Sequence, residues 1–144
     1  MNTNLKKDEN CIFCKIIEGK IPTNKVYEDD YFIAILDVSP ANRGHVIILP
    51  KSHAADIFEL PKELAEKIFV VAKKIAEALK KAYHCDGINI LQNNGEAAGQ
   101  TVFHLHVHVI PRYKNDTVSV EWVQKEIDDF EVVKEEIQKE LQGV

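Results

Sequence analysis

The sequence lacks the features of a membrane-spanning or a secreted protein. Its 144 residues contain no stretch approaching the roughly 20 consecutive apolar residues of a transmembrane helix. The first ten residues, MNTNLKKDEN, have neither the apolar segment nor the small-residue cleavage site of a secretory signal peptide. We therefore expect no membrane association and a cytoplasmic location.

Positive charge is also scarce. The chain has 18 Lys and Arg against 23 Asp and Glu, a net charge of −5, and its basic residues form only short groups such as Lys80-Lys81. We therefore expect no broad basic surface for nucleic acid, because such binding depends on neutralising many phosphates. Any phosphate-bearing ligand must be held by a few local groups.

Cysteines are too few, and odd in number, for a disulfide framework: there are three. Two of them form the pair Cys11-x-x-Cys14, which suggests either metal binding or redox chemistry. The redox interpretation is weakened because no βαβ pattern surrounds the pair. Cys85 is interpreted as a small residue near a helix end.

The composition that is present, 45% apolar and 28% charged with both signs interspersed, is typical of a soluble globular protein. The length suits one domain, residues 1–144, with its own core. Apolar residues at steps of three and four predict an amphipathic helix over residues 61–83, and a similar spacing marks residues 121–141. We predict a helical turn at residues 11–19 and strands within residues 25–29, 31–38, 45–50, 87–93 and 101–110. This order favours an α+β fold, an antiparallel sheet with helices on one side.

Three of the six histidines alternate with apolar residues in TVFHLHVHVIPR, residues 101–112. Because side chains alternate between the faces of a strand, we expect His104, His106 and His108 to point one way and the apolar residues the other. Such a row could face solvent, share a metal ion, or perform nucleophilic and acid–base catalysis. The preceding loop, NNGEAAGQT, contains Gly95 and Gly99, which permit the tight conformations in which backbone N–H groups converge on a phosphate.

These motifs together resemble the histidine triad (HIT) family. HLHVHVI matches its signature of three histidines alternating with apolar residues, and the preceding loop matches too. CIFCKIIEGKIPTNKVYEDD, ILDVSP and GHVIILPKSH are similar to the amino-terminal half of the family's Hint-like bacterial branch. The resemblance covers residues 11–113, which predicts a core there and a less characteristic extension over residues 114–144.

The resemblance implies a five-stranded antiparallel sheet with one long helix and a C-terminal helix. It also implies a two-fold homodimer in which two sheets form one continuous ten-stranded sheet. The implied activity is that of a nucleotidyl hydrolase or transferase acting at the α-phosphate of a purine nucleotide or nucleoside phosphoramidate. His106 would attack phosphorus and carry the nucleotidyl group until water removes it.

The other site residues follow from the same resemblance. His108 and His45 would lie at the phosphate. Asn93, Gln100 and Thr101, in the loop that contains Gly99, would bind its oxygens or the leaving group. Asp37 would hold the ribose hydroxyls. The apolar slot for the base would be formed by Phe13, Ile16, Ile21 and Val38.

The resemblance also implies two further metal ligands beside the cysteine pair. Cys11, Cys14, His53 and His104 would bind one zinc ion per chain, and a closed set of two thiolates and two imidazoles is a structural site. The ion would tie the amino-terminal turn to the histidine segment and would not take part in the chemistry.

Three other readings remain open. The first is a diadenosine polyphosphate hydrolase, as in the fragile histidine triad branch. The second is a nucleotide-binding regulatory protein with vestigial catalysis. The third is a catalytic metal held by histidines, which would need an open coordination position and a nearby carboxylate, and no carboxylate lies in the histidine segment itself.

Overall fold

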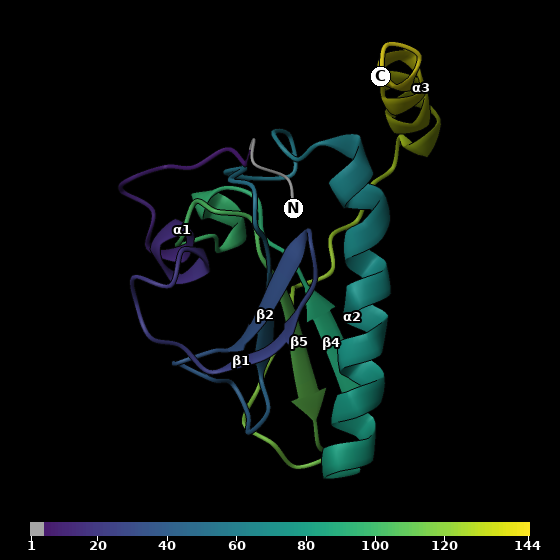
Figure 1. The fold of residues 1–144 in the computed structure, drawn as a ribbon. Coiled ribbons are helices and arrows are strands. Elements are labelled where there is room, and N and C mark those ends of the chain that lie inside the picture. Colours follow the sequence, from purple (N-terminus) through teal and green to yellow (C-terminus); the bar gives the residue numbers. More distant parts are fainter. Residues whose placement is uncertain (1–4) are drawn as a thin grey trace.

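The structure, a computed structural model, describes residues 5–144, and five strands form one antiparallel sheet (Figure 1). The strands lie in the order β1-β2-β3-β5-β4, so the last two strands along the chain exchange places. Their bounds are β1 Lys25–Glu28, β2 Phe32–Leu36, β3 Val46–Pro50, β4 Gly87–Leu91 and β5 Val107–Arg112. The predicted α+β fold with a five-stranded antiparallel sheet is confirmed.

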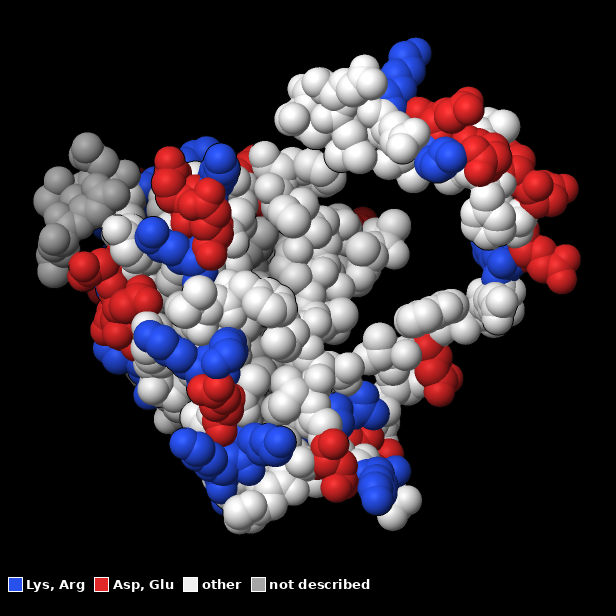
Figure 2. Space-filling model, turned by 90° about the vertical axis from the view of Figure 1, so that its right-hand side faces the viewer, with Lys and Arg blue, Asp and Glu red and all other residues white. Residues whose placement is uncertain are grey.

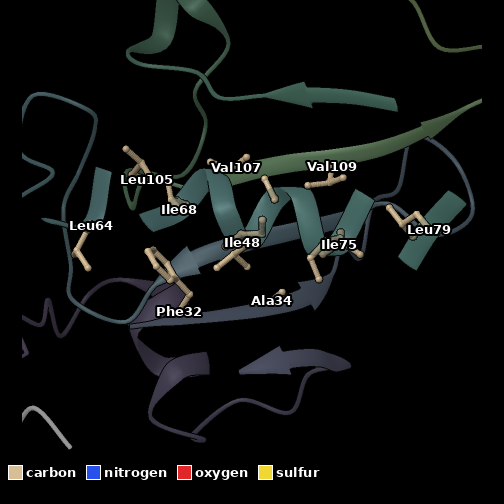
Figure 3. Packing of buried hydrophobic residues seen from close by; sticks show 13 residues of the cluster. Phe32, Ala34, Ile48, Leu64, Ile68, Ile75, Leu79, Leu105, Val107 and Val109 are labelled. Atoms are coloured by element: carbon tan, nitrogen blue, oxygen red, sulfur yellow. The ribbon is translucent and has the colours of Figure 1, made fainter. Parts of the chain in front are cut away.

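The long helix α2, Lys62–Tyr83, covers one face of this sheet (Figures 1 and 3). Pro61 precedes its first turn, and His84 ends it in the left-handed conformation. The predicted helix is therefore confirmed to within one residue. Its apolar stripe and the facing strands form the main core, which includes Leu64, Ile68, Ile75 and Leu79 from α2 and Phe32, Ala34, Ile48, Val107 and Val109 from the sheet.

The opposite face of the sheet carries the short helix α1, Ile12–Ile17. A second apolar cluster of Ile33, Ile35, Ile47 and Leu49 packs there against Phe13, Ile16 and Ile17. A six-residue helix is too short to be stable by itself, so α1 depends on these contacts and on the groups at its ends. The functional residues lie on this face.

The strand predicted over residues 101–110 begins later than expected, at Val107. Val107 pairs with Ile48 of β3, and the next partners would be Leu49 and Pro50. Pro50 has no N–H for the ladder, and its carbonyl accepts a hydrogen bond from Nε2 of His104 at 2.8 Å. His104 therefore precedes the strand, and the three histidines do not form one row on a regular strand.

The C-terminal helix is also shorter than its apolar spacing indicates. α3 spans Phe130–Leu141, whereas the spacing begins near residue 121. Trp122 and Val123 are 83% and 88% exposed, so no packing stabilises a helix there. Figure 2 shows this segment arching away from the body of the protein. Within residues 5–144, no helix is both long and apolar enough to cross a membrane.

Candidate active site and metal centre

A cavity of about 590 Å³ lies between α1, the sheet face opposite α2 and the loop before β5. All of the predicted catalytic and nucleotide-binding residues line it: Phe13, Ile16, Ile21, Asp37, Val38, His45, Asn93, Gly99, Gln100, Thr101, His106 and His108. The loop contains a single 3₁₀ turn, η1, Glu96–Ala98. Three separate parts of the sequence, residues 12–23, 35–47 and 91–110, thus meet at one cavity.

Backbone contacts fix the protonation of His106. Its Nδ1 lies 2.8 Å from the carbonyl oxygen of His104, and since a carbonyl can only accept, Nδ1 carries the proton and donates. Nε2 of neutral His106 is then an unprotonated nitrogen with a free lone pair. Burial lowers the pKa of this imidazole from its ordinary value, which keeps the ring neutral near pH 7.

His108 has the opposite tautomer. The backbone N–H of Ala41 donates to Nδ1 of His45 at 2.9 Å, so neutral His45 carries its proton on Nε2. Nε2 of His45 in turn lies 2.9 Å from Nδ1 of His108 and donates to it, which leaves the proton of His108 on its own Nε2. Burial lowers the pKa of both rings, that of His108 to about 4. Neighbouring rings therefore offer a lone pair (His106) and an N–H donor (His108).

Asp37 supplies the carboxylate that was not visible in the histidine segment itself. Its Oδ1 accepts from the N–H of Ser39 at 2.8 Å, and its Oδ2 lies 3.4 Å from Nε2 of His45 and 3.8 Å from Nδ1 of His108. Two imidazoles and a carboxylate can bind a metal. Here the Ala41 N–H occupies Nδ1 of His45 and leaves Nε2 protonated, so His45 has no lone pair for an ion. Asp37, His45 and His108 together are better suited to sharing a proton than to binding a metal ion.

The loop before β5 uses its polar groups internally. Gln100 accepts from the N–H of Gly95 at 2.8 Å and donates to the carbonyls of Ala55 and Val102. The N–H groups of Gly99 and Gln100 are also bonded to carbonyls within the loop. The N–H groups of Thr101 and Val102, which also line the cavity, have no backbone partner within residues 5–144, so the expected contact of loop N–H groups with a phosphate stays a prediction for these two. In residues 5–144 no hydrogen-bond partner is found for the side chains of Asn93 and Thr101, which remain able to contact a ligand.

The four predicted metal ligands form a separate cluster beside the cavity. Sγ of Cys11 and Sγ of Cys14 lie 3.4 Å and 3.6 Å from Nδ1 of His104. Nδ1 of His53 lies 3.4 Å from Sγ of Cys14 and 3.1 Å from Nδ1 of His104. A tetrahedral zinc ion would hold sulfur and nitrogen ligands about 3.6 Å apart and two nitrogens about 3.3 Å apart. The cluster therefore has the dimensions of a zinc site.

Protonation also suits a cation in this cluster. Nε2 of His104 donates to the Pro50 carbonyl, so Nδ1 directs its lone pair at the two sulfur atoms. Burial raises the pKa of the Cys14 thiol to about 11 when no cation is present. A bound cation would offset that cost by favouring the thiolate. The donor set and the tautomer of His104 fit a closed two-cysteine, two-histidine site.

The depressed pKa of His108 predicts a pH-dependent stability. An unfolded imidazole has a pKa of about 6.5, so between about pH 6.5 and pH 4 the unfolded chain binds more protons than the folded one. The contribution of His108 to the free energy of unfolding is fully present above this window and is lost as the pH falls through it. Between pH 7 and pH 4.5, the free energy of unfolding of His108→Asn should fall by about 2 kcal/mol less than that of wild type.

Chemical denaturation of both proteins at the two pH values measures this difference. His84→Asn, at the exposed end of α2, controls for the loss of one imidazole. An equal pH dependence in wild type and His108→Asn would contradict the expectation. Changes at the metal cluster affect both proteins alike and cancel in the comparison.

Comparison with known proteins agrees with this geometry. The protein-family model of the HIT domain matches residues 18–115 of this chain. The chain belongs to the HIT family. The resemblance predicted from the histidine signature is thus confirmed. Among relatives, this HIT protein is 48% identical to "Protein hit" of Bacillus subtilis, over 85% of this chain and 84% of the relative. It is 44% identical to "Adenylylsulfatase HINT3" of Arabidopsis thaliana over 74% of this chain, but spans only 54% of that relative.

Solved structures of HIT proteins share the fold. A HIT family protein from Bacillus anthracis superposes with a TM-score of 0.87 at 45% identity, covering 96% of this chain and 99% of that one. A histidine triad nucleotide-binding protein from Candida albicans has a TM-score of 0.83 at 36% identity, with 93% and 99% covered. A zinc-bound histidine triad family protein from Mycobacterium smegmatis has a TM-score of 0.73 at 40% identity, with 87% and 88% covered.

Sequence reasoning suggests that a strand carbonyl or an adjacent ring fixes the tautomer of His106, but it does not identify the individual backbone groups of this HIT site. The N–H of Ala41 and the carbonyls of Pro50 and His104 set the tautomers of three histidines. A backbone group has no residue-type signal, so its role is visible only once the chain is folded. Apolar cavity residues such as Ile35 and Ile110 were likewise assigned only to strands.

Proposed function

We propose that this HIT protein is a nucleotidyl hydrolase or transferase that cleaves nucleoside phosphoramidates or related nucleotides at the α-phosphate. The observation that carries the proposal is the pair of opposite tautomers at one cavity. The negative charges of the bound phosphate and of Asp37 favour a protonated His108 in the complex. Nε2 of His106 attacks phosphorus, the bond from phosphorus to the leaving nitrogen breaks, and the imidazolium of His108 gives its Nε2 proton to that nitrogen and becomes neutral. Water then attacks phosphorus, the bond to His106 breaks, and the proton of water returns to His108.

The remainder of the cavity suits a nucleoside monophosphate. Its volume of about 590 Å³ lies within the range of about 300–1,000 Å³ typical of small-molecule sites. Apolar side chains of Phe13, Ile16, Ile21 and Val38 would hold a purine, and Asp37 would accept from the ribose hydroxyls. The adenylylsulfatase and nucleotide-binding relatives support a nucleotide substrate, since their names describe activity or binding of this class.

The decisive test is a mass spectrum of protein quenched during turnover of an adenosine phosphoramidate. We expect an added adenylyl mass on the peptide that contains His106. Diadenosine polyphosphate and adenylyl sulfate, offered under the same conditions, compare the alternative leaving groups. Binding of AMP without turnover of any of these compounds would favour a regulatory protein over an enzyme.

The metal cluster is proposed to hold one structural zinc ion per chain. All four ligand positions are filled by Cys11, Cys14, His53 and His104, so no open position remains for substrate or water. When bound, the ion would supply a cross-link between segments distant in sequence. The zinc-bound relative supports this choice of metal. Elemental analysis of protein purified without chelator should give about one zinc per chain, and less than about a tenth would contradict the assignment.

We also propose that two copies form a symmetric dimer through α2 and β4. Among the described strands β4 pairs only with β5, so its other edge can pair with the same strand of a second copy. Phe69 and Val70 of α2 are 65% and 57% exposed, and the side of the protein that carries α2 has a broad area without charged side chains (Figure 2). The exposed apolar residues around Trp122 add surface that a second copy could cover.

Phe69→Glu is expected to weaken this dimer at least tenfold, because a carboxylate would be buried against an apolar surface. Sedimentation equilibrium at micromolar concentration should give twice 16.4 kDa for wild type and a lower mass for the variant. Lys74→Glu is the control, because Lys74 lies on the flank of α2 that faces Tyr27 of β1, with Nζ 5.7 Å from that ring's centre. A wild-type mass of one chain would refute the dimer, and a fully dimeric Phe69→Glu would refute this contact.

A further inference from the structure

One short helix joins the metal cluster to the cavity. Cys11 and Cys14 lie at the start of α1 and direct their sulfur atoms at His53 and His104. Between them, Phe13 turns toward the cavity, where it forms part of the wall together with Ile12 and Ile16. Two of the residues that would hold the cation therefore alternate with residues that would hold the base, with Cys11 as the N-cap of α1 and Phe13, Cys14 and Ile16 within it.

A second connection runs through His104. Its ring belongs to the metal cluster, whereas its carbonyl accepts the Nδ1–H of His106. The ring of Phe13 packs edge-on against both imidazoles, with centres 5.9 Å from His104 and 5.1 Å from His106. A shift of the cluster thus moves both the hydrogen bond that fixes the nucleophile's tautomer and the aromatic ring beside it.

α1 has little else to hold it in place. Its packing on the sheet comes from Phe13, Ile16 and Ile17, while Ile12 is half exposed. Six residues are about half the length at which an isolated helix becomes even marginally stable. Without a cation, the two buried thiols and two imidazoles lose the interaction that draws the start of α1 toward His104. The cavity wall would then be the part of the fold most easily disordered.

We propose that the cation at Cys11, Cys14, His53 and His104 organises the nucleotide site, so that metal and nucleotide bind with positive coupling and Phe13 is the positioning residue between them. This inference rests on the proposed function, because it requires a nucleotide in the cavity. Coupling between two binding sites is reciprocal: the factor by which zinc tightens nucleotide binding equals the factor by which nucleotide tightens zinc binding.

Calorimetry with AMP and GMP, the products of the proposed hydrolysis, tests the coupling without turnover. We expect each nucleotide that binds zinc-loaded protein to bind chelator-treated protein about tenfold more weakly, within the usual range of about 5–150-fold. A competing zinc indicator, with and without saturating nucleotide, should give the same factor. If neither nucleotide binds zinc-loaded protein, the proposed function fails; if affinity is equal with and without zinc, only the coupling fails.

Two variants locate the coupling. The zinc factor is the ratio of nucleotide affinities with and without zinc. Phe13→Leu keeps an apolar wall but removes the ring, and should reduce this zinc factor to below about threefold. Val38→Ala trims the wall outside α1, and should weaken nucleotide binding while leaving the zinc factor intact. If the zinc factor were the same in Phe13→Leu and Val38→Ala, the role of Phe13 would be overturned.

Two further measurements separate this effect from general unfolding. Long-range ¹H–¹⁵N spectra should show His106 protonated at Nδ1 in zinc-loaded protein and a mixture of tautomers after chelation. Circular dichroism should show that the helical signal of α2 survives chelation. Loss of that signal would contradict the proposal, because the metal would then support the entire fold and not the α1 wall in particular.

Discussion

His106→Asn is expected to lower turnover by at least about 10⁴-fold while AMP still binds within about threefold of wild type. In the proposed mechanism Nε2 of His106 is the only nucleophile that the protein supplies, and losing a catalytic nucleophile commonly costs four or more powers of ten. Asparagine is smaller than histidine, and its amide N–H can still donate to the His104 carbonyl that now accepts from Nδ1. The cavity should therefore keep its shape.

Steady-state turnover of an adenosine phosphoramidate, with calorimetric titration of AMP, measures both halves of this expectation. Turnover of His106→Asn within tenfold of wild type would remove His106 as the nucleophile. Loss of AMP binding in parallel with turnover would instead indicate that the substitution disrupted the cavity.

His108→Asn is the matched control, because it removes a proton donor and leaves the nucleophile. General acid catalysis typically contributes about 10²–10⁴-fold, so an amine leaving group should suffer a loss of that size. A nitrophenyl ester of AMP, whose leaving group needs no proton, should suffer much less. The adenylyl mass on His106 should still form in this variant and should be absent in His106→Asn.

The sequence was sufficient for the parts of the fold that depend on side-chain periodicity. The stripe of Leu64, Ile68 and Ile75 predicts α2 because only one helical face can be buried against a sheet. The alternation of Val107 and Val109 with histidine similarly predicts β5. The site residues converge because the signature places the rings in one short segment and because that segment lies beside β3, which His45 immediately precedes.

What the sequence could not provide depends on contacts between distant segments. Spacing alone makes His104 equivalent to His106, and only the family resemblance assigned it to the cysteines; the physical cause, the Pro50 carbonyl that directs its lone pair toward them, needs the folded chain. Ala41 shows no chemical signal, yet its N–H decides that His45 donates to His108. The spacing of apolar residues after Glu121 suggests a helix, but Trp122 is 83% exposed and gains little from packing.

Removing the metal is expected to lower the melting temperature by about 10–15 °C and to change kcat at saturating substrate by less than about threefold. The cluster joins Cys11 and Cys14 to His53 and His104, so the cation closes long loops of the chain. At a free zinc concentration about a thousand times its Kd, binding stabilises the folded state by about 4 kcal/mol. For a chain of this length, that corresponds to the stated shift in melting temperature.

Thermal melting of zinc-loaded, chelator-treated and Cys14→Ser protein tests this expectation, with zinc content determined on each sample. Cys85→Ser is the control, because Cys85 is also a buried free cysteine but lies outside the cluster, and it should retain zinc and melt near wild type. The small change in kcat is expected because saturating substrate, through the same coupling, restores the ordered site, in which the lone pair of His106 and the proton of His108 are set by carbonyl, N–H and imidazole groups of the protein. A catalytic ion would behave in the opposite way, with chelation stopping turnover at every substrate concentration while the melting temperature changed little. Abolished kcat in a chelated protein that remains folded at the assay temperature would therefore reject the structural role of the metal.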